Sequence, residues 1–157
     1  MSTRTVGWLW VAGQFAALGV LLFLPWRTPN PLLLSVGAVV ALGGGFLGLA
    51  TSRALGDAFT PSPVPIAGSG LRTTGVYSVI RHPMYAAVLL IVIGVLIAAG
   101  SIWGWAWGVV IAVFFLLKSR WEDALLRSED GASWEEWAEV TGGLVPRTGL
   151  RGPDETR

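Results

Sequence analysis

The sequence of 157 residues is 53% hydrophobic and only 13% charged, with a formal net charge of +1, no cysteine and one histidine. A soluble domain carries about 25% charged residues, so this composition indicates a membrane protein. The lack of cysteine excludes disulfides, thiolate metal sites and a cysteine nucleophile, and one histidine excludes a histidine-rich metal site, so we expect no metal centre. The chain also lacks the basic stripe that would indicate nucleic-acid binding.

Two uncharged runs in the first third of the chain predict the first two membrane spans. Twenty-two uncharged residues separate Arg4 from Arg27, and 25 separate Arg27 from Arg53. A spanning helix needs roughly 20 mostly apolar residues, which places these spans at 7–24 and 32–50. The first run ends without a small-residue cleavage site, so we expect a retained helix rather than a signal peptide.

The second predicted span is rich in glycine. Small residues allow a neighbouring helix to approach closely, because they leave room for its backbone. We therefore expect helix packing at Gly37, Gly43, Gly44, Gly45 and Gly48.

A polar segment at 51–81 follows the second span. Its centre contains Pro61, Pro63 and Pro65. Each proline fixes φ and removes a backbone donor, so this stretch cannot lie inside a helix. We expect an extended loop at the membrane surface.

The next uncharged run, at 83–117, is too long for one span. At 1.5 Å per residue a single helix would be roughly 52 Å long, against a hydrocarbon core of roughly 30 Å. The chain must therefore fold back, and Gly100-Ser101 is the natural turn. This hairpin gives a third span at 84–99 and a fourth at 105–117.

The remainder of the chain, at 118–147, is charged and forms a predicted tail. The segment 120–127 continues the fourth helix, and Gly131 ends it. Ser133 then opens a second short helix, with the spacing of a capping box to Glu136.

Together these elements predict an all-α integral membrane protein. It would form a single domain over residues 1–157, with about four transmembrane helices, a helical hairpin of spans three and four, and a short cytoplasmic helical tail. Four spans place the N-terminus, the 51–81 loop and the tail on one side, together with ten of the eleven lysines and arginines. Only Arg27 falls on the other side. The positive-inside rule then places both termini in the cytoplasm. We expect the protein in a bacterial inner (cell) membrane.

Two clusters of polar residues flank the predicted hairpin. The first is Arg81-His82-Pro83-Met84-Tyr85, where the third span enters the bilayer, and the second runs from Lys118 to Asp123, where the fourth span leaves. Interfacial anchoring is one explanation for such residues. The ends of a hairpin are neighbours, however, so the two clusters can meet over one cavity. Ionisable residues at this depth are a functional-site hypothesis.

These clusters resemble a known signature. The string from Thr73 to Tyr85 resembles the Arg-His-Pro-x-Tyr motif of the isoprenylcysteine carboxyl methyltransferase and phospholipid methyltransferase superfamily. In that family a helical hairpin and an acidic pair follow the motif, and here Glu122-Asp123 occupies the position of the pair. Val145-Pro146-Arg147 is similar to the C-terminal Val-Pro-Arg of the family. Upstream, Leu55-Gly56, Phe59 and Pro61-Ser62-Pro63 also fit, so the resemblance covers 55–147.

The resemblance implies S-adenosylmethionine bound between the third span, the fourth span and the tail. Glu122 would hold the α-ammonium of this donor, and Arg81 or His82 its carboxylate. Tyr85 and the tryptophans would offer faces for the adenine or the sulfonium. The implied cofactor-binding residues are Tyr77, Arg81, His82, Pro83, Tyr85, Glu122 and Asp123.

The resemblance also implies a membrane-embedded, amphipathic methyl acceptor, either isoprenylcysteine-carboxylate-like or phospholipid-like. It would enter laterally from the bilayer, and Arg120 or Arg147 would pair with the carboxylate or phosphate of its head group. The implied catalytic residues are thus Arg120, Glu122 and Arg147. Which acceptor is methylated, and in which oligomeric state, stays open.

The sequence departs from the family pattern at several positions. Asp123 stands for the second glutamate, Ala87 for a glycine and Val76 for a proline, and Trp134 and Trp137 stand for tyrosines, whose hydroxyl contacts would be lost.

Two other classes of protein remain open from the sequence. A nicotinamide-dependent membrane reductase of the sterol-reductase type carries a similar motif, but with asparagine where this chain has Met84. A non-enzymatic four-helix membrane protein such as a proton-coupled exporter would need a carboxylate within a span, where the first span offers only Gln14.

Overall fold

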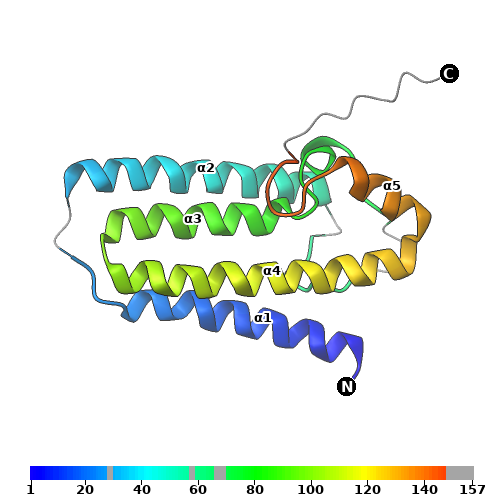
Figure 1. Ribbon diagram of the computed structural model, residues 1–157, viewed down its shortest axis with the longest axis horizontal. Helices are drawn as coiled ribbons and strands as arrows, with labels where there is room; N and C mark the ends of the chain where they lie inside the picture. The colour runs from blue at the N-terminus through cyan, green and yellow to red at the C-terminus, as the bar shows by residue number, and fades with distance from the viewer. Residues whose placement is uncertain (28–29, 57–58, 66–69, 148–157) are drawn as a thin grey trace.

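A computed structural model describes residues 1–27, 30–56, 59–65 and 70–147. In these residues the chain is helical (Figure 1), with α1 (Thr3–Val20), η1 (Leu21–Phe23), α2 (Pro31–Leu55), η3 (Gly75–Ser78), α3 (Pro83–Ala99), α4 (Ile102–Asp130) and α5 (Ala132–Val140). The described part contains no strand, and its one extended pairing is a parallel bridge between Ile80 and Gly142. The predicted all-α fold is confirmed.

Each of the four predicted spans corresponds to helical structure, although the first, 7–24, includes Leu24, which lies just outside η1. Three helical segments are long and apolar enough to cross a membrane: α1 with η1, α2 and α4. The fourth, α3, is apolar but has only 17 residues. Asn30 caps α2 by accepting hydrogen bonds from the backbone of the first turn, and Pro31 supplies the fixed φ of the first helical position.

Helix boundaries differ from the sequence prediction at two places. The helix α2 continues to Leu55, five residues into the predicted 51–81 loop, because nothing in that stretch breaks a helix. The prediction of a capping box at Ser133 is wrong. Gly131, at φ +51°, ends α4 and directly precedes α5, so Ser133 already has helical backbone and its hydroxyl caps nothing.

The α3–α4 hairpin turns where the sequence predicts. Gly100 adopts φ +60° as the C-cap of α3, a left-handed conformation that glycine accepts without strain. Ser101 then caps α4, and its Oγ accepts a hydrogen bond from the Gly104 amide. This turn returns the chain so that α4 runs antiparallel beside α3.

Glycine allows α2 and α3 to pack closely. A Cβ added to Gly94 would lie 2.5 Å from the Gly37 carbonyl oxygen, and one added to Gly44 would lie 2.7 Å from the Ala87 carbonyl oxygen. Such distances exclude a side chain, so the predicted packing role is confirmed at Gly37 and Gly44. Gly43 and Gly45 face open space instead.

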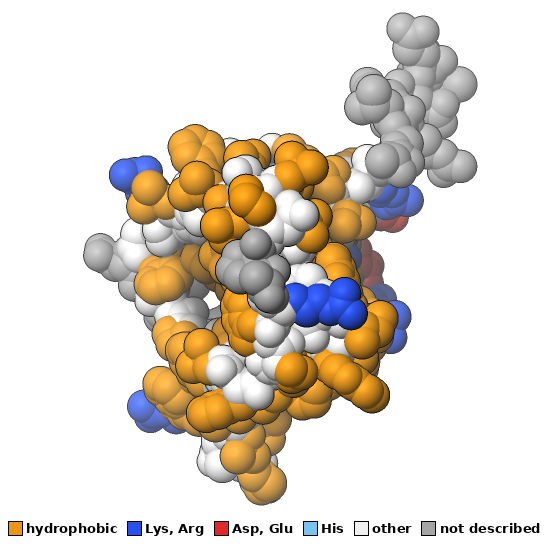
Figure 2. All heavy atoms as spheres, turned by 90° about the vertical axis from the view of Figure 1, so that its left-hand side faces the viewer, with side chains coloured by type: hydrophobic (Ala, Val, Ile, Leu, Met, Phe, Trp, Pro, Cys, Tyr) orange, Lys and Arg blue, Asp and Glu red, His pale blue; other side chains and the backbone are white. Residues whose placement is uncertain are grey.

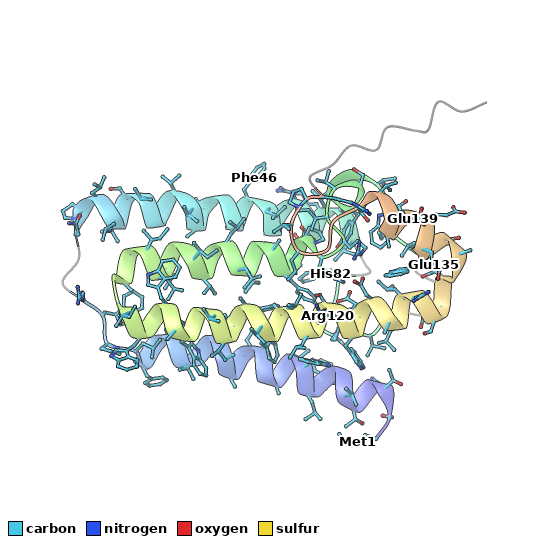
Figure 3. The ribbon with its side chains drawn as sticks, in the orientation of Figure 1. Met1, Phe46, His82, Arg120, Glu135 and Glu139 are labelled. Carbon is cyan, nitrogen blue, oxygen red and sulfur yellow. The ribbon has the colours of Figure 1, made fainter. Side chains whose placement is uncertain are left out.

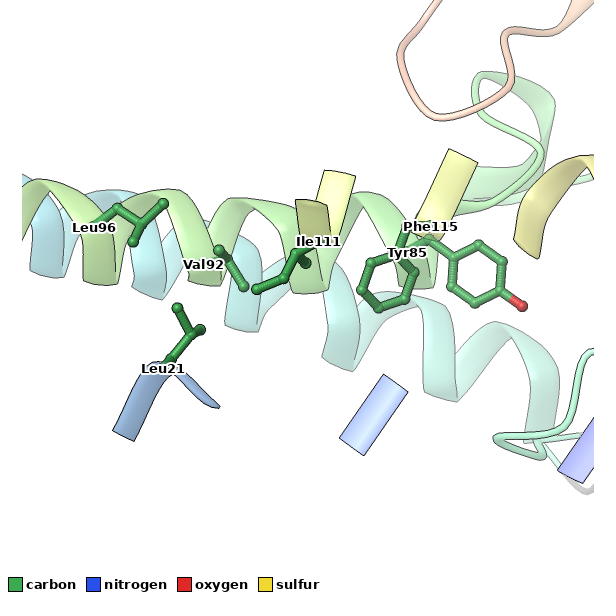
Figure 4. Packing of buried hydrophobic residues seen from close by; sticks show 6 residues of the cluster. All are labelled: Leu21, Tyr85, Val92, Leu96, Ile111 and Phe115. Atoms are coloured by element: carbon green, nitrogen blue, oxygen red, sulfur yellow. The ribbon is translucent and has the colours of Figure 1, made fainter. Parts of the chain in front are cut away.

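The bundle has one apolar end and one polar end. Figure 1 shows the N-terminus, the C-terminal end of α2, the start of α3 and the helix α5 at the same end. The opposite end, at the α3–α4 turn, presents mostly hydrophobic side chains (Figure 2). The hydrophobic core lies between α1, α3 and α4 (Figure 4) and contains Leu21, Tyr85, Val92, Leu96, Ile111 and Phe115.

Candidate active site

The two predicted clusters meet at the polar end of the bundle, between α3 and α4 (Figure 3). Nε2 of His82 lies 2.9 Å from Oδ1 of Asp123, and Nδ1 lies 3.6 Å from Oε2 of Glu122. The hydroxyl of Tyr85 donates a 2.5 Å hydrogen bond to the same Glu122 oxygen. His82 is only 4% exposed, so its ring is fixed between two carboxylates.

Local sequence sets the position of His82. Pro83 is the first residue of α3, and a proline disfavours helical backbone in the residue before it. His82 therefore stands as the N-cap at φ −120° and ψ 60°, outside the helix. Its amide donates to the Gly143 carbonyl, and the Arg81 amide donates to the Gly142 carbonyl, which holds the tail beside the start of α3.

The imidazole of His82 is held in its protonated form. Burial alone would lower its pKa, but the hydrogen bonds and charges of Asp123 and Glu122 outweigh burial and raise the pKa of His82 to about 9. At neutral pH an imidazolium therefore donates from both ring nitrogens toward the two carboxylates.

Arg81 is engaged by the protein itself. Its Nε and Nη2 each lie 3.4 Å from an oxygen of Asp123, and its Nη1 donates to the carbonyls of Thr141 (2.7 Å) and Ala138 (3.3 Å). These carbonyls close the C-terminal end of α5. The guanidinium also lies over the ring of Trp134, at 5.7 Å from its centroid. Arg81 thus joins α3, α4 and α5.

A cavity of about 300 Å³ opens beside these groups, within the size range of ligand pockets. Six predicted site residues line it: Tyr77, Arg81, His82, Pro83, Tyr85 and Glu122. Asp123 does not line it and instead anchors Arg81 and His82 from behind.

The structure does not bring Arg120 or Arg147 to the cavity. Both side chains are exposed at the polar end of the molecule. Arg147 donates to the backbone carbonyl of Glu139 in α5. Contact of either arginine with an acceptor head group stays a prediction.

Sequence reasoning missed several residues that line the cavity. They come from α1, from the proline-rich segment (residues 59–65) and from the residues before η3, and include Gln14, Phe15, Pro61, Pro63, Leu71 and Arg72. One signal pointed to this wall: Gln14 is a polar residue in an otherwise apolar span. The Nζ of the fully buried Lys118 donates to Gln14 Oε1 at 2.7 Å and to the Pro61 carbonyl at 3.3 Å, joining α4, α1 and the proline-rich segment.

The tryptophans of α5 have structural partners of their own. The indole nitrogen of Trp137 donates a 2.8 Å hydrogen bond to the Tyr77 carbonyl, beside the cavity. The ring of Trp134 lies close to the guanidinium groups of both Arg81 and Arg127, at 5.7 and 5.9 Å from its centroid. At Trp137 a hydrogen bond to the backbone is thus present although the tyrosine hydroxyl is absent.

The helices and this partly polar cavity define a class: a multi-pass membrane protein with a concave site where a helical hairpin ends. Residues 32–129 match the model of the phospholipid methyltransferase family. Because the match covers more than half of the chain, the chain belongs to this family, within the superfamily of isoprenylcysteine carboxyl and phospholipid methyltransferases. No curated protein matches the chain.

Family membership fixes the class of reaction. Members are S-adenosylmethionine-dependent methyltransferases, so the chain is a membrane methyltransferase with this cofactor. The match excludes the non-enzymatic class and favours methyl transfer over nicotinamide-dependent reduction. It runs from α2 to the end of α4, so the cavity residues Gln14 and Trp137 lie outside it.

Proposed function

We propose that the cavity at the polar end of α3 and α4 binds S-adenosylmethionine and that the methyl acceptor is a membrane-embedded amphipathic molecule, phospholipid-like or isoprenylcysteine-carboxylate-like. The observation that carries the first part is the environment of Glu122. Its Oε2 accepts the hydrogen bond of Tyr85, whereas its Oε1 accepts none from any described residue. The side chain is 25% exposed and lines the cavity.

The residues present suit this cofactor. Its amino-acid end carries an ammonium, and a carboxylate with one free oxygen can accept a charge-assisted hydrogen bond from it. Tyr85 and His82 would hold the Glu122 carboxylate in a fixed orientation, because both approach the same oxygen. The aromatic rings of Phe15, Tyr77 and Trp137 also line the cavity and supply surfaces for a purine.

Bound S-adenosylmethionine supplies a methyl group activated by a positively charged sulfur. The chain would contribute mainly position and exclusion of water, since methyl transfer by in-line displacement needs little acid–base help beyond an unprotonated nucleophile. The proline-rich segment serves this role. It is held over the cavity by Lys118 and by close contact of Val64 with Gly7, where an added Cβ would lie 2.6 Å from Val64 Cγ2.

Apolar residues at the cavity support an acceptor that enters from the bilayer. Phe15 of α1, Leu55 of α2 and Val88 of α3 line the cavity. Their helices expose apolar side chains elsewhere along their length, such as Phe46 of α2 (Figure 3). The head group of such an acceptor would remain at the polar end, near exposed Arg120 and Arg147.

Two measurements test this proposal. Glu122→Gln should weaken the binding of S-adenosylhomocysteine by about 1.5–3 kcal/mol, the usual contribution of a charge-assisted hydrogen bond. Glu136→Gln, at an exposed position of α5, is the control and should bind like wild type. Equal binding by folded Glu122→Gln and wild type would remove Glu122 from the site.

The acceptor is tested by incubating the purified protein with radiolabelled S-adenosylmethionine and a membrane lipid extract. We expect the label in a lipid fraction, which mass spectrometry then identifies. Label that appears only in water-soluble products would contradict the membrane-embedded acceptor.

A further inference from the structure

Arg72 stands apart from the other cationic side chains that line the cavity. Arg81 is committed to Asp123 and to the carbonyls of α5, and His82 is committed to Asp123 and Glu122. Arg72 is exposed, lines the same cavity and makes no hydrogen bond or ion pair with any residue in the described ranges. Among the described lining residues it is therefore the cation whose donors are free.

Arg72 and Glu122 place opposite charges around one cavity residue. Burial raises the pKa of the Tyr77 hydroxyl, Glu122 raises it further, and Arg72 lowers it. Both charges therefore act on the same phenol, which itself lines the cavity. A ligand that carries an ammonium and a carboxylate on one carbon atom needs such a pair of opposite charges.

We infer that Arg72 binds the carboxylate of the amino-acid end of S-adenosylmethionine, in the same cavity where Glu122 would hold the ammonium. This inference rests on the proposed function and revises the sequence expectation, which gave that carboxylate to Arg81 or His82. A guanidinium can donate two parallel hydrogen bonds to a carboxylate. Arg81 and His82 instead hold the two acidic residues of α4 in place.

The test compares two ligands that differ only in the carboxylate: S-adenosylhomocysteine and its decarboxylated analogue, adenosyl-thiopropylamine. Each is titrated calorimetrically into the full-length protein in detergent. Arg72→Gln should weaken the binding of S-adenosylhomocysteine about tenfold and leave the binding of the analogue within about twofold, because the analogue lacks the group that Arg72 contacts. Arg72→Lys should weaken the binding of S-adenosylhomocysteine less than Arg72→Gln does, because lysine keeps the charge but not the bidentate geometry.

Arg53→Gln is the matched control, since Arg53 is an exposed arginine in the last turn of α2 that does not line the cavity. It should change the binding of neither ligand. The inference would be overturned if Arg72→Gln weakened the binding of both ligands equally, or the binding of neither. Unchanged cofactor binding with a raised KM for the lipid acceptor would also overturn it, and would assign Arg72 to the acceptor head group. If wild type itself binds no S-adenosylhomocysteine, it is the proposed function that fails.

Discussion

His82 shows how single residues set the character of this site. Its ring lies between Asp123 and Glu122, and Arg81 also contacts Asp123. The buried imidazolium brings the two carboxylates of α4 against the start of α3, and Tyr85 completes the arrangement by donating to Glu122. One oxygen of Glu122 is thereby left for a ligand. Buried charges of this kind are stable only when each has a partner, so removal of one group leaves the remaining charges buried and unpaired.

This arrangement predicts a dependence of stability on pH. The folded protein holds the pKa of His82 at about 9, against 6.5 for a free histidine. The protonated ring therefore stabilises the fold fully below about pH 6.5, and this contribution is lost as the pH rises through about 9. The difference corresponds to about 3 kcal/mol. The melting temperature in detergent should fall over this window, and His82→Gln should melt lower at pH 6.5 and show a flatter profile. A variant with the wild-type slope would contradict the account.

The meeting of these residues was predictable from sequence, but their roles were only partly so. A charge-free run of 35 residues must fold back, and a hairpin brings Arg81-His82 close to Glu122-Asp123. The pattern could not show that Asp123 takes up the donors of Arg81. The pairing of Arg81 with Asp123 depends on side-chain geometry and on the tail. The carbonyls of Ala138 and Thr141 accept the remaining hydrogen bonds of the guanidinium.

Among the secondary-structure elements, the α2–α3 pair is the most tightly fitted. Gly37 and Gly94 face each other, so the two backbones come into contact without intervening side chains. Close packing of small residues favours helix association in lipid, where there is no hydrophobic driving force between helices. The pair therefore forms a rigid support for the start of α3, where the site residues lie.

Substitution at this contact should destabilise the fold. A Cβ on Gly94 would lie 2.5 Å from the Gly37 carbonyl oxygen and 2.7 Å from the Ala41 amide nitrogen, so Gly94→Ala should cost about 1–3 kcal/mol of unfolding free energy. Gly43→Ala, on the open face of α2, should be neutral or slightly stabilising. Unfolding titrations followed by circular dichroism compare the two. Equal effects of both substitutions would contradict the packing described.

Most elements were predictable because runs without charge and the prolines mark where helices start and stop. The end of α2 was not, because a helix can continue beyond the bilayer without changing its hydrophobic pattern. The start of α5 was not, because Gly131 directly precedes the helix and Ser133 lies within it. The cavity wall built by α1 and the proline-rich segment was also out of reach. Its position depends on Gly7 admitting Val64 and on Lys118 reaching Gln14, which are contacts between residues more than 50 positions apart in sequence.

At the scale of the whole molecule, the functional groups gather at one end. Figure 1 shows both described chain ends, the start of α3 and the helix α5 at that end. Arg27 lies at the other end, where its amide donates to the Ala99 carbonyl. This distribution of basic residues is the basis of the predicted orientation, with the candidate site on the cytoplasmic side.

The orientation can be measured because the chain contains no cysteine. Single cysteines are introduced at Ser78 and Ser128, at the polar end, and at Ile102, at the α3–α4 turn; all three positions are exposed. An impermeant thiol reagent should label Ile102→Cys in intact cells and label the other two only after permeabilisation. The opposite pattern would reverse the predicted orientation.

Binding of S-adenosylmethionine in the cavity of this membrane methyltransferase can be tested without any substitution. The most direct measurement is thermal unfolding of the purified protein with S-adenosylhomocysteine and, separately, with nicotinamide dinucleotides. A ligand that binds only the folded state stabilises it by about 2.7 kcal/mol at a concentration of roughly 100 times its Kd. We predict that S-adenosylhomocysteine raises the melting temperature of wild type and that nicotinamide dinucleotides leave it unchanged. Stabilisation by the dinucleotides, with none by S-adenosylhomocysteine, would contradict the account.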